Sequence, residues 1–257
     1  MAGRLARQAR RPGQHFLRSV RVVRALVDSA GIEAGDLVVD VGAGRGAITG
    51  ELVRRGADVW AVEADPVLAR VLRERFERRV RVVEADARQL RWPSQRFSIV
   101  ANLPFAGATE ILDSLLADPA VQLQRAGVVL QWEAAAKRAA IWPSTLLGVL
   151  WGAMYELRLV GRLAPSAFAP PPAVDAGVLS VVRRPEPLVP PSAFDAYRRL
   201  VRRAFEARAP VRRVLPALPV KRLADELGFS PAALPRDLDA RQWAELFARV
   251  RANGRGR

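Results

Sequence analysis

Four residues near the middle of the chain, Asn102-Leu103-Pro104-Phe105, have side chains that suit one kind of chemistry. They follow the largely apolar run 97–101 and so lie where a buried strand is expected to end. The Asn102 side-chain oxygen and the Leu103 carbonyl oxygen could accept both N–H bonds of an exocyclic amine on a nucleobase. Pro104 would stiffen the turn, and Phe105 could stack on the base. The alternative is an ordinary turn with a core phenylalanine.

Three glycines, Gly42, Gly44 and Gly46, close a second apolar run and open a helical pattern. Glycine lets a ligand approach the backbone closely, and the free N–H groups of a helix start suit a polar ligand. Glu63 ends the next expected strand, at the spacing from which a carboxylate meets ribose hydroxyls. With Ala47 the pattern also satisfies the looser dinucleotide motif, so a nicotinamide enzyme and a purely structural turn both stay open here.

Asp86 falls at the tip of the third expected strand, where its carboxylate could accept a hydrogen bond from an adenine amino group. The alternative is that Asp86 caps a helix or closes a turn through its own backbone.

The elements that would position these residues alternate between strand and helix. Strands are expected within 36–44, 57–65, 80–90, 96–105, 126–131, 155–165 and 174–184. Helices are expected within 18–31, 47–56, 66–79, 132–139, 194–208, 220–228 and 239–252, the first with Val20, Val23, Leu26 and Val27 on one face. This alternation favours an α/β fold with a doubly wound, Rossmann-like sheet.

Four prolines between Pro185 and Pro191 indicate a linker, and three helical patterns follow it. We therefore expect three parts: a basic N-terminal arm (1–16), an α/β domain (17–185) and a small helical domain (186–257).

The net charge of +15 is concentrated at the two ends of the chain. Residues 1–24 carry seven arginines and no acid, and residues 186–257 carry fifteen Lys or Arg against eight Asp or Glu. The segment between them is nearly neutral, with nineteen against eighteen. This distribution predicts that the ends hold a polyanion such as a nucleic acid. A GC-rich genome would explain arginine in place of lysine, but not the missing acids.

Several classes of protein are disfavoured by composition. The chain has no cysteine, which excludes disulfides and cysteine-based zinc sites. No apolar run reaches the ~20 residues that span a membrane, and the basic N-terminus has no apolar core behind it. A cytoplasmic protein with no metal and no membrane partner is expected.

Seven motifs in this order carry a resemblance to a known family: GQHFL, DVGAGRGAIT, VEAD, EADARQL, NLPF, QWEAAAKRA and FAPPPAVDAGVLSVVRR. The region from Gln14 to Arg184 closely resembles the rRNA adenine N6-methyltransferases, which include small-subunit dimethyladenosine transferases and the macrolide-resistance (Erm-type) enzymes. The family uses S-adenosylmethionine. The resemblance assigns to this cofactor the residues Gln14, His15, Leu17, Gly42, Gly44, Glu63, Asp86, Ala87 and Asn102. It assigns to catalysis Asn102, Leu103, Pro104, Phe105 and Phe168, with Phe168 on the far side of the target base.

The motifs NLPFAGAT and QWEAAAKRA are most similar to the Erm-type enzymes, so the resemblance implies an enzyme that methylates 23S rRNA and gives macrolide, lincosamide and streptogramin B resistance. A monomer is expected. Methylation of small-subunit rRNA during ribosome maturation, or an inactive nucleic-acid-binding relative, are the alternatives. His15 stands where many relatives have Asn, a mild change if the contact there is made by backbone.

Overall fold

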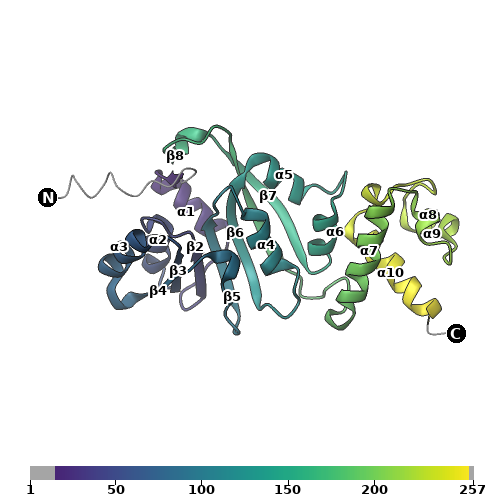
Figure 1. The fold of residues 1–257 in the computed structure, drawn as a ribbon, viewed down its shortest axis with the longest axis horizontal. Coiled ribbons are helices and arrows are strands. Elements are labelled where there is room, and N and C mark those ends of the chain that lie inside the picture. Colours follow the sequence, from purple (N-terminus) through teal and green to yellow (C-terminus); the bar gives the residue numbers. More distant parts are fainter. Residues whose placement is uncertain (1–14, 255–257) are drawn as a thin grey trace. The chain divides into compact units, whose positions relative to one another are not determined.

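The computed structural model describes residues 15–254, and its largest feature is a seven-stranded sheet in the order β4-β3-β2-β5-β6-β9-β7 (Figure 1). The strands are β2 (Leu37–Val41), β3 (Asp58–Glu63), β4 (Val80–Glu84), β5 (Phe97–Asn102), β6 (Leu123–Gln131), β7 (Tyr155–Leu163) and β9 (Ala176–Arg183). A separate two-stranded ribbon joins β1 (Phe16–Leu17) to β8 (Phe168–Ala169). The expected strands are all present.

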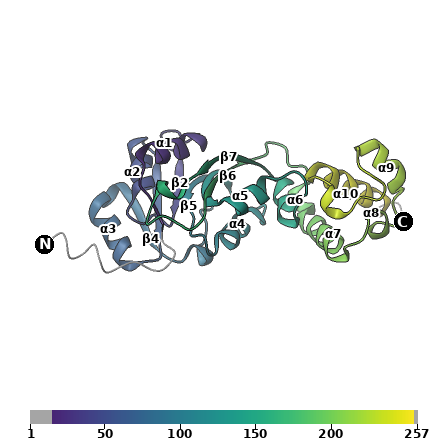
Figure 2. The same ribbon diagram turned by 90° about the horizontal axis from the view of Figure 1, so that it is seen from above.

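Helices cover both faces of the sheet, with α1 and α2 on one side and α4 on the other (Figure 2). Those that come before β7 in the chain are α1 (Val20–Ser29), α2 (Ala47–Arg54), α3 (Pro66–Phe76), α4 (Ala108–Leu116), α5 (Trp132–Ala139) and α6 (Leu146–Gly152). The later helices are α7 (Phe194–Ala207), α8 (Val211–Val214), α9 (Val220–Leu227) and α10 (Ala240–Gly254). This is the expected α/β architecture, a doubly wound, Rossmann-like sheet followed by a helical C-terminal region.

The sheet is parallel from β4 through β6 and becomes antiparallel where β6 meets β9, with Gly127 opposite Ser180. All five residues of β2 are buried, because a central parallel strand is covered on both faces. Strand order reverses between β2 and β5, which are neighbours in the sheet although two strands separate them in sequence. In open α/β sheets, ligands bind beyond the carboxyl ends of the strands at such a reversal.

Helix α1 begins where the Ser19 hydroxyl accepts the Val22 N–H. Val23, Leu26 and Val27 are buried as expected, but Val20 is 62% exposed. The expectation for Val20 was wrong because Val20 is the first residue of α1. The buried face of this helix begins one turn later, at Val23.

The described chain divides into two compact units. The first comprises the described residues up to Ala136 together with Arg158–Val182; the second comprises Lys137–Leu157 and the described residues from Arg183 onward. The division expected from sequence, with boundaries after 16 and 185, assigned 137–157 to the α/β domain. The two divisions differ there because α6 packs against α7 and α10.

The proline-rich segment is a packed part of the second unit and not a loose linker. Leu188 N–H donates to Ala153 O at 2.8 Å, and Arg184 N–H donates to Met154 O at 2.9 Å. Val189 is 1% exposed. The expected linker was wrong because its two apolar residues, Leu188 and Val189, lie between the prolines and anchor them.

No helix among residues 15–254 is long and apolar enough to cross a membrane.

Candidate active site

The glycine turn and the Asn102–Phe105 turn lie together at one edge of the sheet. They follow β2 and β5, which pair in parallel with Val38 opposite Ser98. A Cβ atom on Gly42 would lie 3.7 Å from the Asn102 carbonyl oxygen and 3.9 Å from Pro104 Cδ. Two of the motifs seen in the sequence are therefore in van der Waals reach of each other at the strand-order reversal.

All three glycines of the first turn have positive φ angles, +70° at Gly42, +55° at Gly44 and +76° at Gly46. At Gly44 a side chain is also excluded by space, because a Cβ atom would lie 2.7 Å from Phe16 Cε1. The Gly42 and Ala43 N–H groups both donate to Val62 O, at 2.9 and 3.1 Å, and tie the turn to β3. The glycines are thus required by backbone conformation and by close packing, apart from any ligand.

Glu63, at the end of β3, is 6% exposed and holds the backbone of the glycine turn through hydrogen bonds. Its Oε2 accepts the Gly44 N–H at 2.8 Å, and its Oε1 accepts the Asp65 N–H at 2.9 Å. A carboxylate has about four acceptor sites, so each oxygen keeps a further lone pair. The predicted contact with a ribose diol is compatible with this arrangement.

Asp86 follows β4 and caps a single 3₁₀ turn, Ala87–Gln89, by accepting the Arg88 N–H at 2.9 Å. The Arg88 guanidinium also lies on the carboxylate, with Nε at 3.0 Å from Oδ1 and Nη2 at 2.5 Å from Oδ2. The hydrogen bonds from the Arg88 side chain and backbone lower the pKa of Asp86 to about 2. Asp86 is therefore ionised at every working pH, beside the half-buried Ala87.

Asn102 is the most constrained polar residue of the second turn. Its Nδ2 donates to the His15 carbonyl oxygen at 2.6 Å. Its Oδ1 is buried and has no hydrogen-bond partner among the described residues. A buried acceptor without a partner costs free energy of about 1–3 kcal/mol, so this oxygen is available to an incoming N–H donor.

The rest of that turn is divided between core and surface. Leu103 is 2% exposed and its N–H donates to Val129 O at 3.1 Å, which fixes the turn to β6. Pro104 is exposed, and Phe105 is half-buried with its ring 5.7 Å from the His15 ring. Phe105 thus presents part of an aromatic face at the same edge.

The N-terminal residues reach this site through the β1–β8 ribbon. Leu17 pairs with Phe168 and Phe16 with Ala169, while His15 Nδ1 donates to Pro170 O at 2.9 Å. His15 meets Asn102 through its backbone carbonyl, so the contact does not depend on its imidazole. Leu17 is 8% exposed. Gln14 lies outside the described residues.

Phe168 is not brought to the surface of the site. It is 1% exposed and packs in the core cluster that also holds Leu17. Phe105, which is partly buried, packs against the same cluster. The position of Phe168 as the second face around a base stays a prediction, and it requires this side chain to be uncovered.

Two residues that sequence reasoning missed belong to this region. The first is Arg88, which pairs with Asp86. The second is Asp40, a fully buried residue of β2. Its Oδ2 accepts the Thr49 hydroxyl at 2.6 Å, and its Oδ1 has no hydrogen-bond partner among the described residues. Burial raises the pKa of Asp40 to about 7, and the charge of Glu63 acts in the same direction. A single acid inside the apolar run 37–41 was the available signal.

Residues 15–254 contain no group of three or more His, Cys, Asp or Glu side chains placed to hold a metal ion.

Comparison with known proteins gives three concordant results. A family described as ribosomal RNA adenine dimethylase matches residues 6–233 of the chain. The mycinamicin-resistance protein MyrB of Micromonospora griseorubida is 33% identical over 247 residues, covering 94% of this chain and 79% of that protein. Ribosomal RNA small subunit methyltransferase A of Opitutus terrae is 34% identical over 262 residues, covering 92% of this chain and 91% of that protein.

Among solved structures, the 23S rRNA methyltransferase ErmE superposes with a TM-score of 0.82 at 28% identity, covering 92% of this chain and 99% of that one. A dimethyladenosine transferase from Plasmodium falciparum has a TM-score of 0.76 at 18% identity, covering 93% and 98%, and shares the fold.

Proposed function

The chain belongs to the ribosomal RNA adenine dimethylase family, and from this premise we propose that its target is an adenine N6 of 23S rRNA. The chain is an rRNA adenine methyltransferase. Its similarity to MyrB and to ErmE supports the choice of 23S rRNA over other RNA. Methylation there would block macrolides, lincosamides and streptogramin B, and the enzyme would act in the cytoplasm, where ribosomes are.

The buried Oδ1 of Asn102, which has no hydrogen-bond partner within residues 15–254, is the observation that carries the catalytic proposal. This oxygen is fixed in place, because Nδ2 of the same amide is held by His15 O and the following Leu103 is held by Val129 O. It can accept one N–H of the target amine and so aim the lone pair of the nitrogen away from the Asn102 turn. Positioning of this kind can supply a large part of a rate enhancement without a dedicated base.

The residues at the same edge fit S-adenosylmethionine as the methyl donor. Gly42 and Gly44 would bring the backbone of the turn beside its methionine part. Glu63 keeps free lone pairs for the ribose hydroxyls, and ionised Asp86 offers an acceptor to the adenine. When bound, this group supplies an electrophilic methyl carbon. The half-buried Phe105 would stack on the target base after it leaves the RNA helix.

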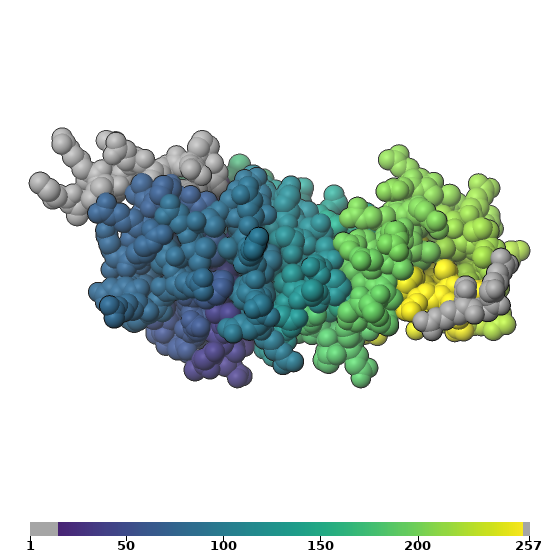
Figure 3. All heavy atoms as spheres, turned by 60° about the horizontal axis from the view of Figure 1, so that its bottom comes forward, coloured from purple at the N-terminus to yellow at the C-terminus, as the bar shows by residue number. Residues whose placement is uncertain are grey.

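Arginines on α7 support an RNA partner for the second unit. Arg199, Arg202 and Arg203 are exposed on one side of α7, and none has an acidic partner among the described residues. The surface of α7, coloured green, faces the viewer in Figure 3. We propose that residues 186–257 and the basic arm hold RNA phosphates while the α/β domain does the chemistry; all but His15 and Phe16 of that arm lie outside the described residues.

A methylation assay tests the proposal. Protein-free 23S and small-subunit rRNA are each incubated with labelled methyl donor, and primer extension maps the modified base. We expect labelling of 23S rRNA at one adenine, and a loss of about 100-fold or more in rate for Asn102→Ala, the scale seen when one positioned hydrogen-bonding group is removed. Equal labelling by the variant would refute the role of Asn102.

Small-subunit rRNA is the second candidate substrate, because the Opitutus terrae relative is as similar as MyrB and is covered more completely. Labelling confined to small-subunit rRNA would replace the 23S proposal. Calorimetry with S-adenosylmethionine distinguishes both methyltransferase hypotheses from an inactive RNA-binding relative, which would show no cofactor binding.

A further inference from the structure

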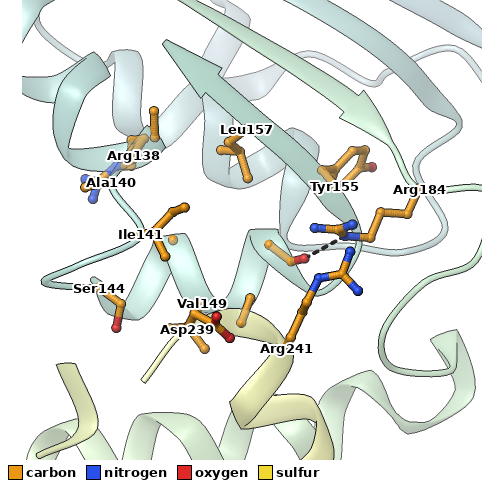
Figure 4. A pocket seen from close by; sticks show the side chains of 14 residues that line it. Arg138, Ala140, Ile141, Ser144, Val149, Tyr155, Leu157, Arg184, Asp239 and Arg241 are labelled. Atoms are coloured by element: carbon orange, nitrogen blue, oxygen red, sulfur yellow. Dashed lines mark hydrogen bonds between the residues drawn. The ribbon is translucent and has the colours of Figure 1, made fainter. Parts of the chain in front are cut away.

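A cavity of about 160 Å³ is lined by residues of the second unit, none of which is assigned to methyl transfer. It is bounded by the loop after α5, by α6, by the start of β7 and by the first turn of α10. Much of its lining is apolar, including Ile141, Val149 and Leu157 (Figure 4). Its charged lining residues are Arg138, Arg184, Arg241 and Asp239.

Arg184 and Arg241 direct their guanidinium groups toward the same side of this cavity from different elements (Figure 4). Arg184 follows β9, and its side chain is only 14% exposed; it donates to Gly152 O at 3.0 Å and to Glu156 at 3.1 Å. Those two bonds use Nε and Nη1 and leave Nη2 for another acceptor. The position of this guanidinium is therefore fixed before any ligand arrives.

Arg241 stands in the first turn of α10, is exposed, and has no ion pair or hydrogen bond from its side chain among the described residues. Asp239 also lines the cavity, and its Oδ1 accepts the Gln242 N–H at 2.8 Å at the start of α10. Burial lowers the pKa of Arg184, and the charge of Arg241 adds to this effect. Two like charges share one side of a cavity, and the single acid paired with Arg184, Glu156, is 41% exposed.

We propose that this cavity binds a phosphate group, with Arg184 and Arg241 as its two ligands. Guanidinium forks match the oxygens of a phosphate, and a bound dianion or phosphodiester would relieve the repulsion between them. Placement at the start of a 15-residue helix adds to the attraction for an anion. The phosphate comes either from the RNA backbone, which would make the cavity an anchor for substrate, or from a free phosphomonoester.

The first arm of the test measures RNA binding against salt concentration. Arg241→Gln is compared with Arg249→Gln, an exposed arginine of the same helix that does not line the cavity. If the RNA backbone supplies the phosphate, the slope of log K against log salt falls by about 0.7–0.9 in Arg241→Gln, the value for one lost phosphate contact. The slope for Arg249→Gln stays at the wild-type value.

The second arm measures thermal unfolding with inorganic phosphate or adenosine monophosphate at constant ionic strength. If a free phosphomonoester is the ligand, millimolar concentrations raise the melting temperature of the wild-type chain and of Arg249→Gln, but not of Arg241→Gln. A response in either arm supports the proposal and names the source. Equal responses of the two variants in both arms overturn it.

This inference rests on the proposed RNA substrate for its first arm only. The second arm needs neither rRNA nor methyl donor, so loss of methylation on 23S rRNA and loss of the phosphate site are separate results.

Discussion

Glu63 and Gly44 are joined by a buried hydrogen bond, in which the Gly44 N–H donates to Glu63 Oε2 at 2.8 Å. The bond connects the end of β3 to the middle of the glycine turn after β2. One carboxylate thereby fixes the backbone against which the cofactor is proposed to lie, and the same carboxylate is proposed to hold its ribose. Its other oxygen accepts the Asp65 N–H at 2.9 Å.

Glu63→Gln is expected to weaken the binding of S-adenosylmethionine. An amide has one oxygen and one NH₂ group, so one of the two backbone N–H groups would face a donor and lose its acceptor. The amide also leaves one oxygen in place of two to accept the ribose hydroxyls. A hydroxyl left without its acceptor costs about 1–3 kcal/mol, which corresponds to about 5- to 150-fold in affinity. Calorimetry measures the change. Glu74→Gln, at an exposed ion pair, is the control, and unchanged affinity in Glu63→Gln would remove Glu63 from the site.

Gly44→Ala is expected to destabilise the fold more than Gly35→Ala does. Both positions have positive φ, +55° and +85°, so both variants bear the cost of the left-handed region, about 1–2 kcal/mol. A Cβ on Gly44 also meets Phe16 at 2.7 Å, whereas no atom of the described part of the chain lies within 4 Å of one on Gly35. Overpacking adds about 1–3 kcal/mol. Urea unfolding of the two variants tests this, and equal losses would show that Phe16 does not press on the turn.

Arg88→Ala is expected to make cofactor binding sensitive to acid. In the wild-type chain Asp86, with a pKa of about 2, is ionised from pH 4 upward. Without the guanidinium its pKa moves toward the ordinary 3.8, so up to about 40% of the carboxylates would be protonated at pH 4 and could not accept equally well. Calorimetry at pH 4 and pH 7 should show a larger loss for the variant than for the wild type. If the affinity changed by the same factor between pH 7 and pH 4 in both proteins, Asp86 would not contact the adenine.

Asp40 is expected to make the protein less stable as pH rises from about 4 to about 7. Its pKa is about 7 in the folded chain and near 3.8 when unfolded, so in this range the folded state holds a proton that the unfolded state releases. The stabilisation present below pH 4 is lost through pH 7, at most about 1.4 kcal/mol per pH unit. Asp40→Asn cannot titrate, so the difference in unfolding free energy between the two proteins should follow this slope. A constant difference would contradict the assignment.

The sequence predicted the parts of the site that are local and periodic. Alternating strands and helices predicted a sheet in which β2 and β5 end at one edge, and Gly42 and Asn102 lie there within van der Waals reach. Local turn chemistry was also visible, since Asp86 caps the turn that follows it.

Contacts between distant segments were not visible. The ribbon of β1 with β8 has two residues on each strand, too few for any periodic signal, yet it carries His15 to Asn102. The packing of 137–157 on the C-terminal helices depends on small residues, with a Cβ on Gly152 only 2.8 Å from that of Ala240. The role of Leu188 in holding the proline-rich segment likewise depends on a carbonyl 35 positions earlier, that of Ala153.

The β1–β8 ribbon also bears on the order in which the enzyme is completed during translation. His15 reaches its hydrogen-bond partner Pro170 across 155 positions of sequence. When Asn102 of a nascent chain leaves the ribosomal exit tunnel, β8 has not yet emerged. Without β8, His15 is not held against Asn102. An unfinished copy therefore lacks the contacts that hold His15 beside the proposed catalytic turn until β8, near the end of the first unit, has been made.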